Sequence, residues 1–184
     1  MNDKIEIPLS KNKLLIGTIG SLIFVVLSIW LFFDAAIFQE NSLHFILNPT
    51  TVKGIGILGV LFFGATGIYG FRKLFDKKIG LTVDKKGITD NTHATSVGLI
   101  AWNDITEIVT QQIMSTQFLL IKVKNPEQYI RKAGSRKKDV LLRLNMKMYG
   151  TPLSITATTL KYEFEKIEEI IRTEFKKYKG LGKG

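Results

Sequence analysis

The sequence predicts an α+β protein in which two apolar helices precede an antiparallel sheet and a C-terminal amphipathic helix. Three observations predict this fold class. Two stretches without charged residues are long enough to cross a bilayer, a later region has short runs of alternating apolar and polar residues, and the last stretch repeats apolar residues every three or four positions. We therefore expect a two-helix transmembrane hairpin followed by a bent sheet or barrel that the last helix closes.

The two uncharged stretches, residues 14–33 and 54–71, are predicted transmembrane helices. At 1.5 Å rise per residue they span roughly 30 and 27 Å, which matches a hydrocarbon core of about 30 Å. A buried core helix is an alternative for each stretch, but such helices usually keep a polar stripe toward water. A cleaved signal peptide is an alternative for the first stretch. Its apolar part exceeds the usual length of about 7 to 15 residues, so we interpret it as an uncleaved anchor.

The positions of Lys and Arg predict the orientation, because loops rich in these cations stay on the cytoplasmic side of the membrane. The N-terminal segment, residues 1–13, carries three lysines, and the linker at residues 72–79 carries four Lys or Arg. The connecting loop, residues 34–53, has no Lys or Arg before Lys53. We therefore expect an integral inner-membrane protein with an extracytoplasmic loop and with a cytoplasmic N-terminus and C-terminal domain, residues 80–178.

Small residues line one face of each predicted transmembrane helix. At about 100° per residue, they share an arc on each helix: Gly56, Gly59, Gly67 and Gly70 on the second, and Gly17 and Ser21 on the first. Small residues let helix backbones approach closely in lipid, so we expect the two faces to pack against each other. Formation of a homo-oligomer through one of these faces is the alternative.

Alternating apolar residues after residue 79 predict strands at residues 119–123, 140–148 and 153–157. Residues 84–87 (Asp-Lys-Lys-Gly) and 149–152 (Tyr-Gly-Thr-Pro) supply turn chemistry. From Leu160 to Tyr178 the apolar residues instead recur at helical spacing, with Thr158 or Thr159 as the expected N-cap. This last helix needs a sheet to cover its apolar face, and residues 179–184 are expected to form a flexible tail.

Several short runs resemble the bacterial pleckstrin-homology-like (PH-like) domain: Gly80 to Asp84, Gly87 to Asp90, Leu99 to Ile105, Thr151 to Ile155, and the final helix. With the preceding hairpin, the chain resembles nearly end to end a family of small two-span bacterial membrane proteins. The resemblance implies a PH-like fold and no particular activity. Phosphoinositide-binding relatives carry several cations around the first hairpin, where this chain has Lys85 and Lys86, so specific phosphoinositide recognition is not expected. Trp102 is expected in the core, and Asp104 as a cap of the following turn.

The sequence contains no recognisable catalytic or metal-binding set. It has no cysteine, and its two histidines, His44 and His93, would lie on opposite sides of the membrane, with His93 in a solvated loop. Residues 54–59 spell G-x-G-x-x-G, but no strand precedes this motif, so it is not read as a dinucleotide-binding turn. We expect neither catalysis nor a cofactor nor a metal.

Five cations within eight residues form the strongest local charge signal: Arg131, Lys132, Arg136, Lys137 and Lys138. We expect them in a loop between strands, where they contact anionic lipid or a protein partner. Each cation near an anionic leaflet contributes roughly 1 kcal/mol to binding. A solvated loop without a binding role is the alternative.

These features favour a non-enzymatic, membrane-anchored binding or adaptor module that engages membrane lipids or a protein partner. The alternative is an accessory or immunity-type subunit that acts on another membrane protein through the glycine-rich hairpin. Nucleic acid is not an expected partner, because only Tyr129 among aromatic residues lies beside the basic cluster.

Overall fold

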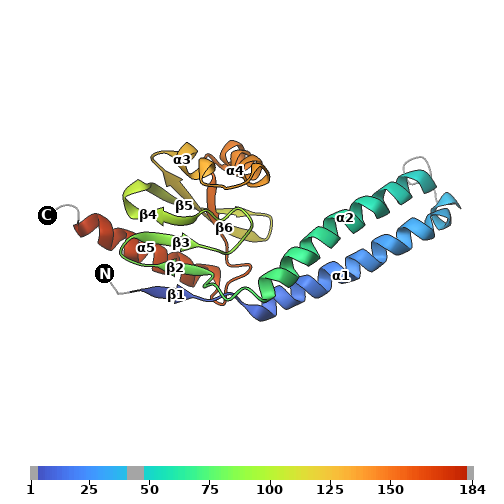
Figure 1. Ribbon diagram of the computed structural model, residues 1–184, viewed down its shortest axis with the longest axis horizontal. Helices are drawn as coiled ribbons and strands as arrows, with labels where there is room; N and C mark the ends of the chain where they lie inside the picture. Colours follow the sequence, from blue (N-terminus) through green and yellow to red (C-terminus); the bar gives the residue numbers. More distant parts are fainter. Residues whose placement is uncertain (1–3, 41–47, 182–184) are drawn as a thin grey trace. The chain divides into compact units, whose positions relative to one another are not determined.

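The computed structural model describes residues 4–40 and 48–181. It confirms a mixed α+β protein with two apolar helices and antiparallel sheets (Figure 1). The chain divides into two compact units: the helix unit is Lys11–Lys77, and the sheet unit joins the residues up to Ser10 with those from Lys78 onward. Part of the predicted outer loop, residues 41–47 with His44, lies outside the described residues, as do residues 182–184 of the predicted tail.

The helix unit contains α1 (Lys11–Phe33), the 3-10 helix η1 (Ala35–Glu40) and α2 (Pro49–Leu74). α2 begins after Asn48, whose side-chain oxygen accepts the Thr51 N–H at 2.9 Å, an arrangement that satisfies one of the unpaired donors of the first turn. Both helices are long and apolar enough to cross a membrane. In the most apolar part of each helix, only 22% of α1 and 6% of α2 is buried within the structure. Such low burial does not fit a core helix of a soluble protein.

The glycine face of α2 packs on a face of α1 that carries small hydroxyl residues. Gly56 and Gly59 lie opposite Ser28, Gly67 lies opposite Ser21, and Gly70 lies opposite Thr18. A Cβ atom placed on Gly67 would lie 2.7 Å from Oγ of Ser21, so a larger residue would push the helices apart. The three hydroxyls donate to carbonyls of α1 itself, which satisfies them inside the helix pair.

Gly17, which the sequence placed on the packing face of α1, does not lie there. A Cβ atom on Gly17 or Gly20 would meet nothing within 4 Å among the described residues. The buried stripe of α1 instead follows Leu14, Thr18 and Ser21. The side chains of Thr18 and Ser21 are small and their hydroxyls bond within α1, so they line the contact in place of Gly17.

The first sheet of the sheet unit has four antiparallel strands in the order β1 (Ile5–Ile7), β2 (Leu81–Val83), β3 (Gly87–Asp90) and β4 (Gly98–Ala101). The β2–β3 turn was predicted: the Asp84 carboxylate accepts the Lys86 N–H at 2.8 Å. Aspartate is favoured in such turns for this reason.

Residues 1–13 were predicted to form a segment separate from the C-terminal domain. Part of this segment instead belongs to the first sheet. Ile5 pairs with Val83 and Ile7 with Leu81, so β1 forms the edge of the first sheet (Figure 1). The whole helix unit is therefore inserted between two neighbouring strands. A strand of three residues shows too little alternation to be recognised from sequence.

The second sheet has the order β5 (Ile105–Ile113), β6 (Thr116–Val123) and β7 (Leu153–Ile155), again antiparallel. The 3-10 turn η2 (Trp102–Asp104) leads from the first sheet into β5. The predicted strands at residues 119–123 and 153–157 correspond to β6 and β7. β6 and β7 are adjacent strands, although two helices separate them in the chain.

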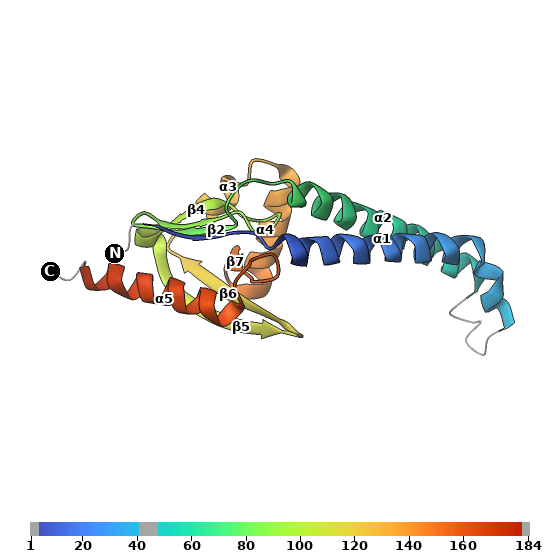
Figure 2. The same ribbon diagram turned by 90° about the horizontal axis from the view of Figure 1, so that it is seen from below.

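The core of the sheet unit is built from both sheets and from α5 (Phe164–Leu181), which runs along them (Figure 2). It includes Ile7, Leu81, Ile88 and Ile100 from the first sheet, Leu119, Ile121 and Ile155 from the second, and Phe164, Ile167 and Ile171 from α5. Trp102 is buried as expected, stacks on Phe175 at 5.9 Å between ring centres, and donates its Nε1–H to the Asp84 carbonyl at 2.8 Å. This packing joins η2 to both the first hairpin and the last helix.

The strand predicted at residues 140–148 is wrong. These residues lie in α4 (Arg136–Tyr149), which follows the short α3 (Pro126–Arg131) between β6 and β7. The side chain of Ser135 accepts the Lys138 N–H at the start of α4, and Gly150 ends it with a φ of 72°. Such caps define a helix, whereas the alternating Leu and Met residues between them are compatible with either structure.

Several helix boundaries also differ from the predictions. The last helix starts at Phe164 and not after Thr159, because Leu160 pairs with Leu9 in an isolated β-bridge. It continues to Leu181, so residues 179–181 of the predicted tail are helical. Likewise α2 continues to Leu74 through the first part of the predicted linker.

Candidate functional site

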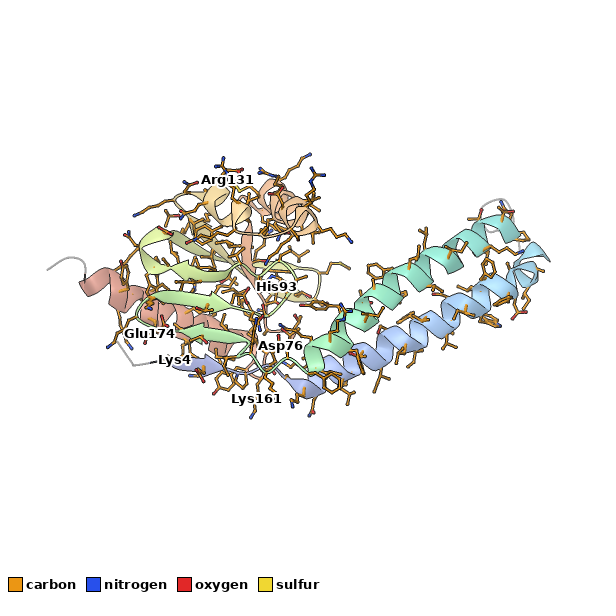
Figure 3. The ribbon with its side chains drawn as sticks, in the orientation of Figure 1. Lys4, Asp76, His93, Arg131, Lys161 and Glu174 are labelled. Atoms are coloured by element: carbon orange, nitrogen blue, oxygen red, sulfur yellow. The ribbon has the colours of Figure 1, made fainter. Side chains whose placement is uncertain are left out.

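The predicted basic cluster lies on two helices and not in a loop between strands. Arg131 is the last residue of α3, Lys132 follows it, and Arg136, Lys137 and Lys138 form the first turn of α4. Figure 3 shows Arg131 on α3, apart from the loop that carries His93. Cations in the first turn of a helix oppose the helix dipole, and here three occur in succession. A pattern that works against local stability often marks a functional surface.

The five cations differ in their surroundings. Arg131, Lys132, Arg136 and Lys137 are exposed, and the Lys132 ammonium lies 4.9 Å from the centre of the Tyr129 ring. Lys138 is half-buried and donates to the Ser96 carbonyl. The structure therefore assigns Lys138 to holding α4 against the loop before β4 and leaves the other four facing solvent.

A hollow of about 470 Å³ brings Arg131 and Lys132 together with Asn125, Glu127 and Gln128 of the α3 region. The carboxylate of Glu127 receives two hydrogen bonds from Arg143, at 2.8 and 3.1 Å. The two cations provide the positive charge of this hollow.

Arg143 links α4 to α3 and contributes to their packing more than to the charged surface. Besides Glu127 it contacts Asp139 at 3.1 Å. Hydrogen bonds from Arg143 to Glu127, and then to Asp139, raise the pKa of the guanidinium. Asp139 is the only acid within α4, so the single negative charge of this helix is already paired.

The sequence-based prediction did not include the two apolar sides of α4. Leu142 is fully buried within the sheet unit, whereas Val140, Leu144 and Met148 are exposed. The spacing of four between these three residues was visible in the sequence. It is a helical signal that the alternation over residues 140–148 concealed.

Asp104 was predicted to cap the turn that follows it, but its carboxylate bonds elsewhere. Its carboxylate accepts the hydroxyl of buried Tyr129 at 2.7 Å, and the Tyr129 oxygen accepts the Ala101 N–H at 3.3 Å. Burial, together with the hydrogen bond to Asp104, raises the pKa of Tyr129 to about 12. A phenol held protonated in this way connects α3 to η2 and does not transfer protons near neutral pH.

His93 is half-buried among polar side chains and is not a solvated loop residue. Its Nδ1 lies 2.7 Å from the Thr92 hydroxyl, 3.0 Å from the Ser96 hydroxyl and 3.5 Å from the Asp90 carboxylate. A hydrolytic triad needs the acid and the nucleophile on opposite nitrogens of the imidazole. Here the hydroxyls and the acid all surround Nδ1, so the cluster orders the loop and does not form a triad.

Acids of α5 form ion pairs with cations of the same helix. Glu168 contacts Arg172 at 2.7 Å and Glu169 contacts Lys166 at 2.8 Å. A hydrogen bond from Thr110, supported by Arg172, holds the pKa of Glu168 below its ordinary value. Over the described residues, no three His, Asp or Glu side chains are placed to hold a metal ion.

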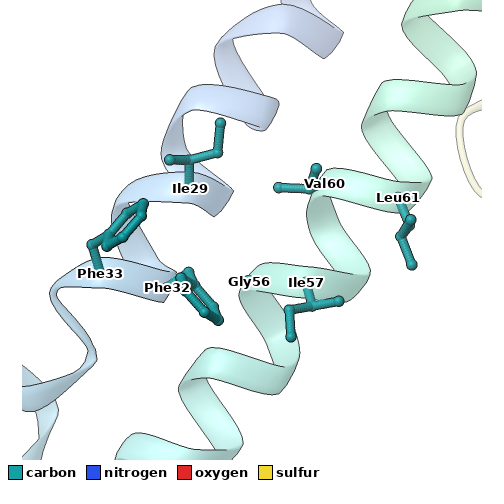
Figure 4. Close-up of a pocket in the computed structure, with 7 residues that line it drawn as sticks. All are labelled: Ile29, Phe32, Phe33, Gly56, Ile57, Val60 and Leu61. Carbon is teal, nitrogen blue, oxygen red and sulfur yellow. The ribbon is translucent and has the colours of Figure 1, made fainter.

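The helix unit contains an apolar pocket of about 210 Å³ between α1 and α2 (Figure 4). Its lining is entirely apolar: Ile29, Phe32, Phe33, Gly56, Ile57, Val60 and Leu61. Lys53 lies near it, with its ammonium 6.0 Å from the centre of the Phe32 ring. Such a pocket offers no hydrogen bond to a polar substrate.

Comparison with known protein families, with curated proteins and with solved structures finds no match for this chain.

Proposed function

We propose that the protein is a non-enzymatic, membrane-anchored binding module. In this proposal α1 and α2 cross the inner membrane, and the sheet unit is a PH-like domain at its cytoplasmic face. The observation that carries the proposal is the pairing of β1 with β2, because these strands precede and follow the two apolar helices in the chain.

This pairing supports an even number of membrane crossings. If one apolar helix crossed the bilayer and the other did not, β1 and β2 would lie on opposite sides and could not exchange hydrogen bonds. Two crossings return the chain to the side from which it started. Lys4 before α1, two lysines in the first turn of α1 and the cations at the end of α2 then favour the cytoplasm for both strands.

The sheet unit fixes both segments that lead into the helices. The Ser10 N–H donates to the Thr159 carbonyl at 2.8 Å, and the Lys161 N–H donates to the Pro8 carbonyl at 3.0 Å. On the other side, the Gly80 carbonyl accepts the Asn91 N–H at 2.8 Å. These contacts support one folded domain that includes residues from before and after the membrane helices.

The arrangement of strands supports the PH-like assignment. A four-stranded and a three-stranded antiparallel sheet follow each other, and a C-terminal helix packs into the core that they share. Domains of this type act by presenting a surface, so function has to be assigned from the surface and not from the fold. The candidate surface is the exposed side of α3 and α4, which carries four of the five clustered cations.

The accessory-subunit alternative receives less support. It needs the glycine face of α2 to contact another protein, but this face is already covered by Thr18, Ser21 and Ser28 of α1. A homo-oligomer through these faces receives less support for the same reason. A partner in the membrane would have to contact the outer faces, where large apolar side chains project.

A cross-linking experiment tests the paired strands in the membrane. The chain has no cysteine, so Glu6→Cys with Thr82→Cys introduces one pair at directly opposed positions of β1 and β2. We expect a disulfide on mild oxidation of membranes. The control pair, Glu6→Cys with Thr89→Cys, is two strands apart, roughly 10 Å, which is too far for a disulfide.

Localisation is tested separately. The protein should stay in the membrane pellet after alkaline carbonate extraction, and a reporter fused after residue 184 should be active only in the cytoplasm. Absence of the Glu6–Thr82 disulfide, or release of the protein into the supernatant, would overturn the proposal.

A further inference from the structure

The exposed side of α4 is an apolar stripe on an otherwise polar surface. Val140 is 63% exposed, Leu144 47% and Met148 53%, whereas Leu142 on the same helix is 0% exposed. Steps of four residues place the three exposed side chains within an arc of about 80°. Leu142 lies about 160° from Leu144 on the same wheel, so α4 buries one face within the sheet unit and presents a second apolar face outward.

This second face is concentrated and not a scatter of single side chains. Among the described residues of the sheet unit, five of the eight exposed large apolar side chains belong to α4: Val140, Leu141, Leu144, Met146 and Met148. Single exposed apolar residues need no explanation, but a contiguous patch marks an interaction surface.

The charges around the stripe are positive. Arg136 and Lys147 border it next to Val140, and Lys137 lies within its arc in the first turn. Asp139 lies on another side of the helix, in contact with Arg143. The face that α4 presents therefore combines apolar side chains with cations and contains no acid.

We propose that α4 lies in the plane of the bilayer interface. Val140, Leu144 and Met148 enter the boundary between headgroups and acyl chains, and Arg136, Lys137 and Lys147 contact the phosphates of anionic lipids. A helix with an apolar stripe flanked by Lys and Arg has the composition of such interfacial helices. The inference rests on the proposed function, because the membrane anchor keeps the sheet unit beside a bilayer at high effective concentration.

Charge decides between lipid and protein as the occupant. A protein partner would need an apolar patch surrounded by acids, whereas an anionic leaflet supplies both an apolar interior and negative headgroups. The long stems of Lys and Arg let these residues cover apolar surface while their charged ends reach the phosphates. The occupant is therefore the anionic leaflet in which the protein itself is anchored.

The test uses the full chain in lipid vesicles. A single cysteine at Leu144→Cys carries an environment-sensitive fluorophore, and the chain has no other cysteine to label. We expect protection from an aqueous quencher in vesicles of phosphatidylethanolamine with phosphatidylglycerol, and loss of protection in phosphatidylcholine alone. The control label, Tyr162→Cys, is also on the surface of the sheet unit at 39% exposure; it should be quenched in both kinds of vesicle.

A triple variant, with Arg136, Lys137 and Lys147 each changed to Gln, tests the charges. Each cation near an anionic surface changes partitioning roughly five-fold, so the three together should shift the bound-to-free equilibrium of α4 on the order of 100-fold. A second variant, Val140→Asn with Met148→Asn, tests the apolar stripe and should also expose the label at residue 144. All these positions are on the surface, and in a Trp30→Phe background an unchanged fluorescence of buried Trp102 shows that each variant is folded.

Equal quenching at residue 144 in both lipid mixtures overturns the inference. So does protection that persists in neutral vesicles and in the triple Gln variant, because protein and not anionic lipid would then cover the stripe. If the Glu6–Thr82 disulfide forms and the label at residue 144 is still quenched, the inference fails while the proposed function stands.

Discussion

The Tyr129 hydroxyl, which Tyr129→Phe removes, contributes to the stability of the sheet unit through two hydrogen bonds. This change deletes the 2.7 Å hydrogen bond to the Asp104 carboxylate and leaves the Ala101 N–H without its 3.3 Å acceptor. Hydrogen bonds to charged groups contribute about 1.5–3 kcal/mol, and an unsatisfied buried donor adds to the loss. Tyr129 is 1% exposed, whereas Asp104 and Ala101 are half-buried, so water replaces the lost partners only in part. We expect the free energy of unfolding to fall by about 2–3 kcal/mol.

The pH dependence of the loss in unfolding free energy tests this prediction a second time. The pKa of Tyr129 is raised from 10.0 to about 12 in the folded protein. The contribution of the protonated hydroxyl is therefore fully present below pH 10 and is lost as the pH rises from 10 toward 12. The difference in stability between the wild type and Tyr129→Phe should shrink over that interval.

The assay is urea unfolding of the full chain in detergent micelles, followed by Trp102 fluorescence. Both proteins carry Trp30→Phe, because the chain has two tryptophans and Trp30 lies in α1. Tyr162→Phe, at an exposed tyrosine, is the matched control and should change stability by less than about 0.5 kcal/mol. A Tyr129→Phe effect as small as this control, or one that is constant between pH 8 and pH 12, would refute the reasoning.

Three further predictions follow from the packing. Leu142→Ala removes a fully buried side chain of α4 and should cost about 2–5 kcal/mol in the same urea assay; a cost below about 1 kcal/mol would mean that α4 is not packed as described. Gly59→Leu should lower the melting temperature of the helix unit in detergent, because its side chain would overlap Ser28, whereas Gly64→Leu points into open space and should not; equal shifts would contradict the helix contact. Thr110→Val removes the main hydrogen bond that lowers the pKa of Glu168, so an NMR titration should show that pKa rising. The stability from this lowered pKa is present above pH 4.5 and lost as the pH falls below it, so the variant should lose less stability on acidification.

The two apolar helices were predictable because their signal is local and long. Eighteen or more residues without charge leave few other structures. The glycine face of α2 was equally predictable, because the period of a helix determines which residues share a side. The exact contact stripe on α1 was not predictable from the sequence. A hydroxyl residue that bonds its own helix can line a helix contact as glycine does, so the sequence does not show whether Thr18 or Gly17 lies at the contact.

The sheet unit was harder to predict because its elements depend on partners far away in the chain. β1 is recognisable only once Leu81 and Val83 are known to lie beside it. In α4 the five apolar residues at positions 140, 142, 144, 146 and 148 fit a period of two, and three of them are also spaced by four. The Ser135 cap and the left-handed Gly150 resolved that ambiguity in favour of a helix. The clustered cations are visible in the sequence, but the surface on which they lie is defined only by the helices that carry them.

The insertion of two membrane helices between β1 and β2 has a consequence for biogenesis. β1 leaves the ribosome first, but its partner follows only after both helices have been made, so the first strand must wait while the membrane segments are inserted. Closing so long a loop is slow. A fragment that starts at Lys78 would lack β1 and present β2 as an open edge, which favours aggregation. Because Ile7 lies opposite Leu81, a short Asn-Gly turn in place of the helix unit should restore the edge and give a water-soluble form of the domain.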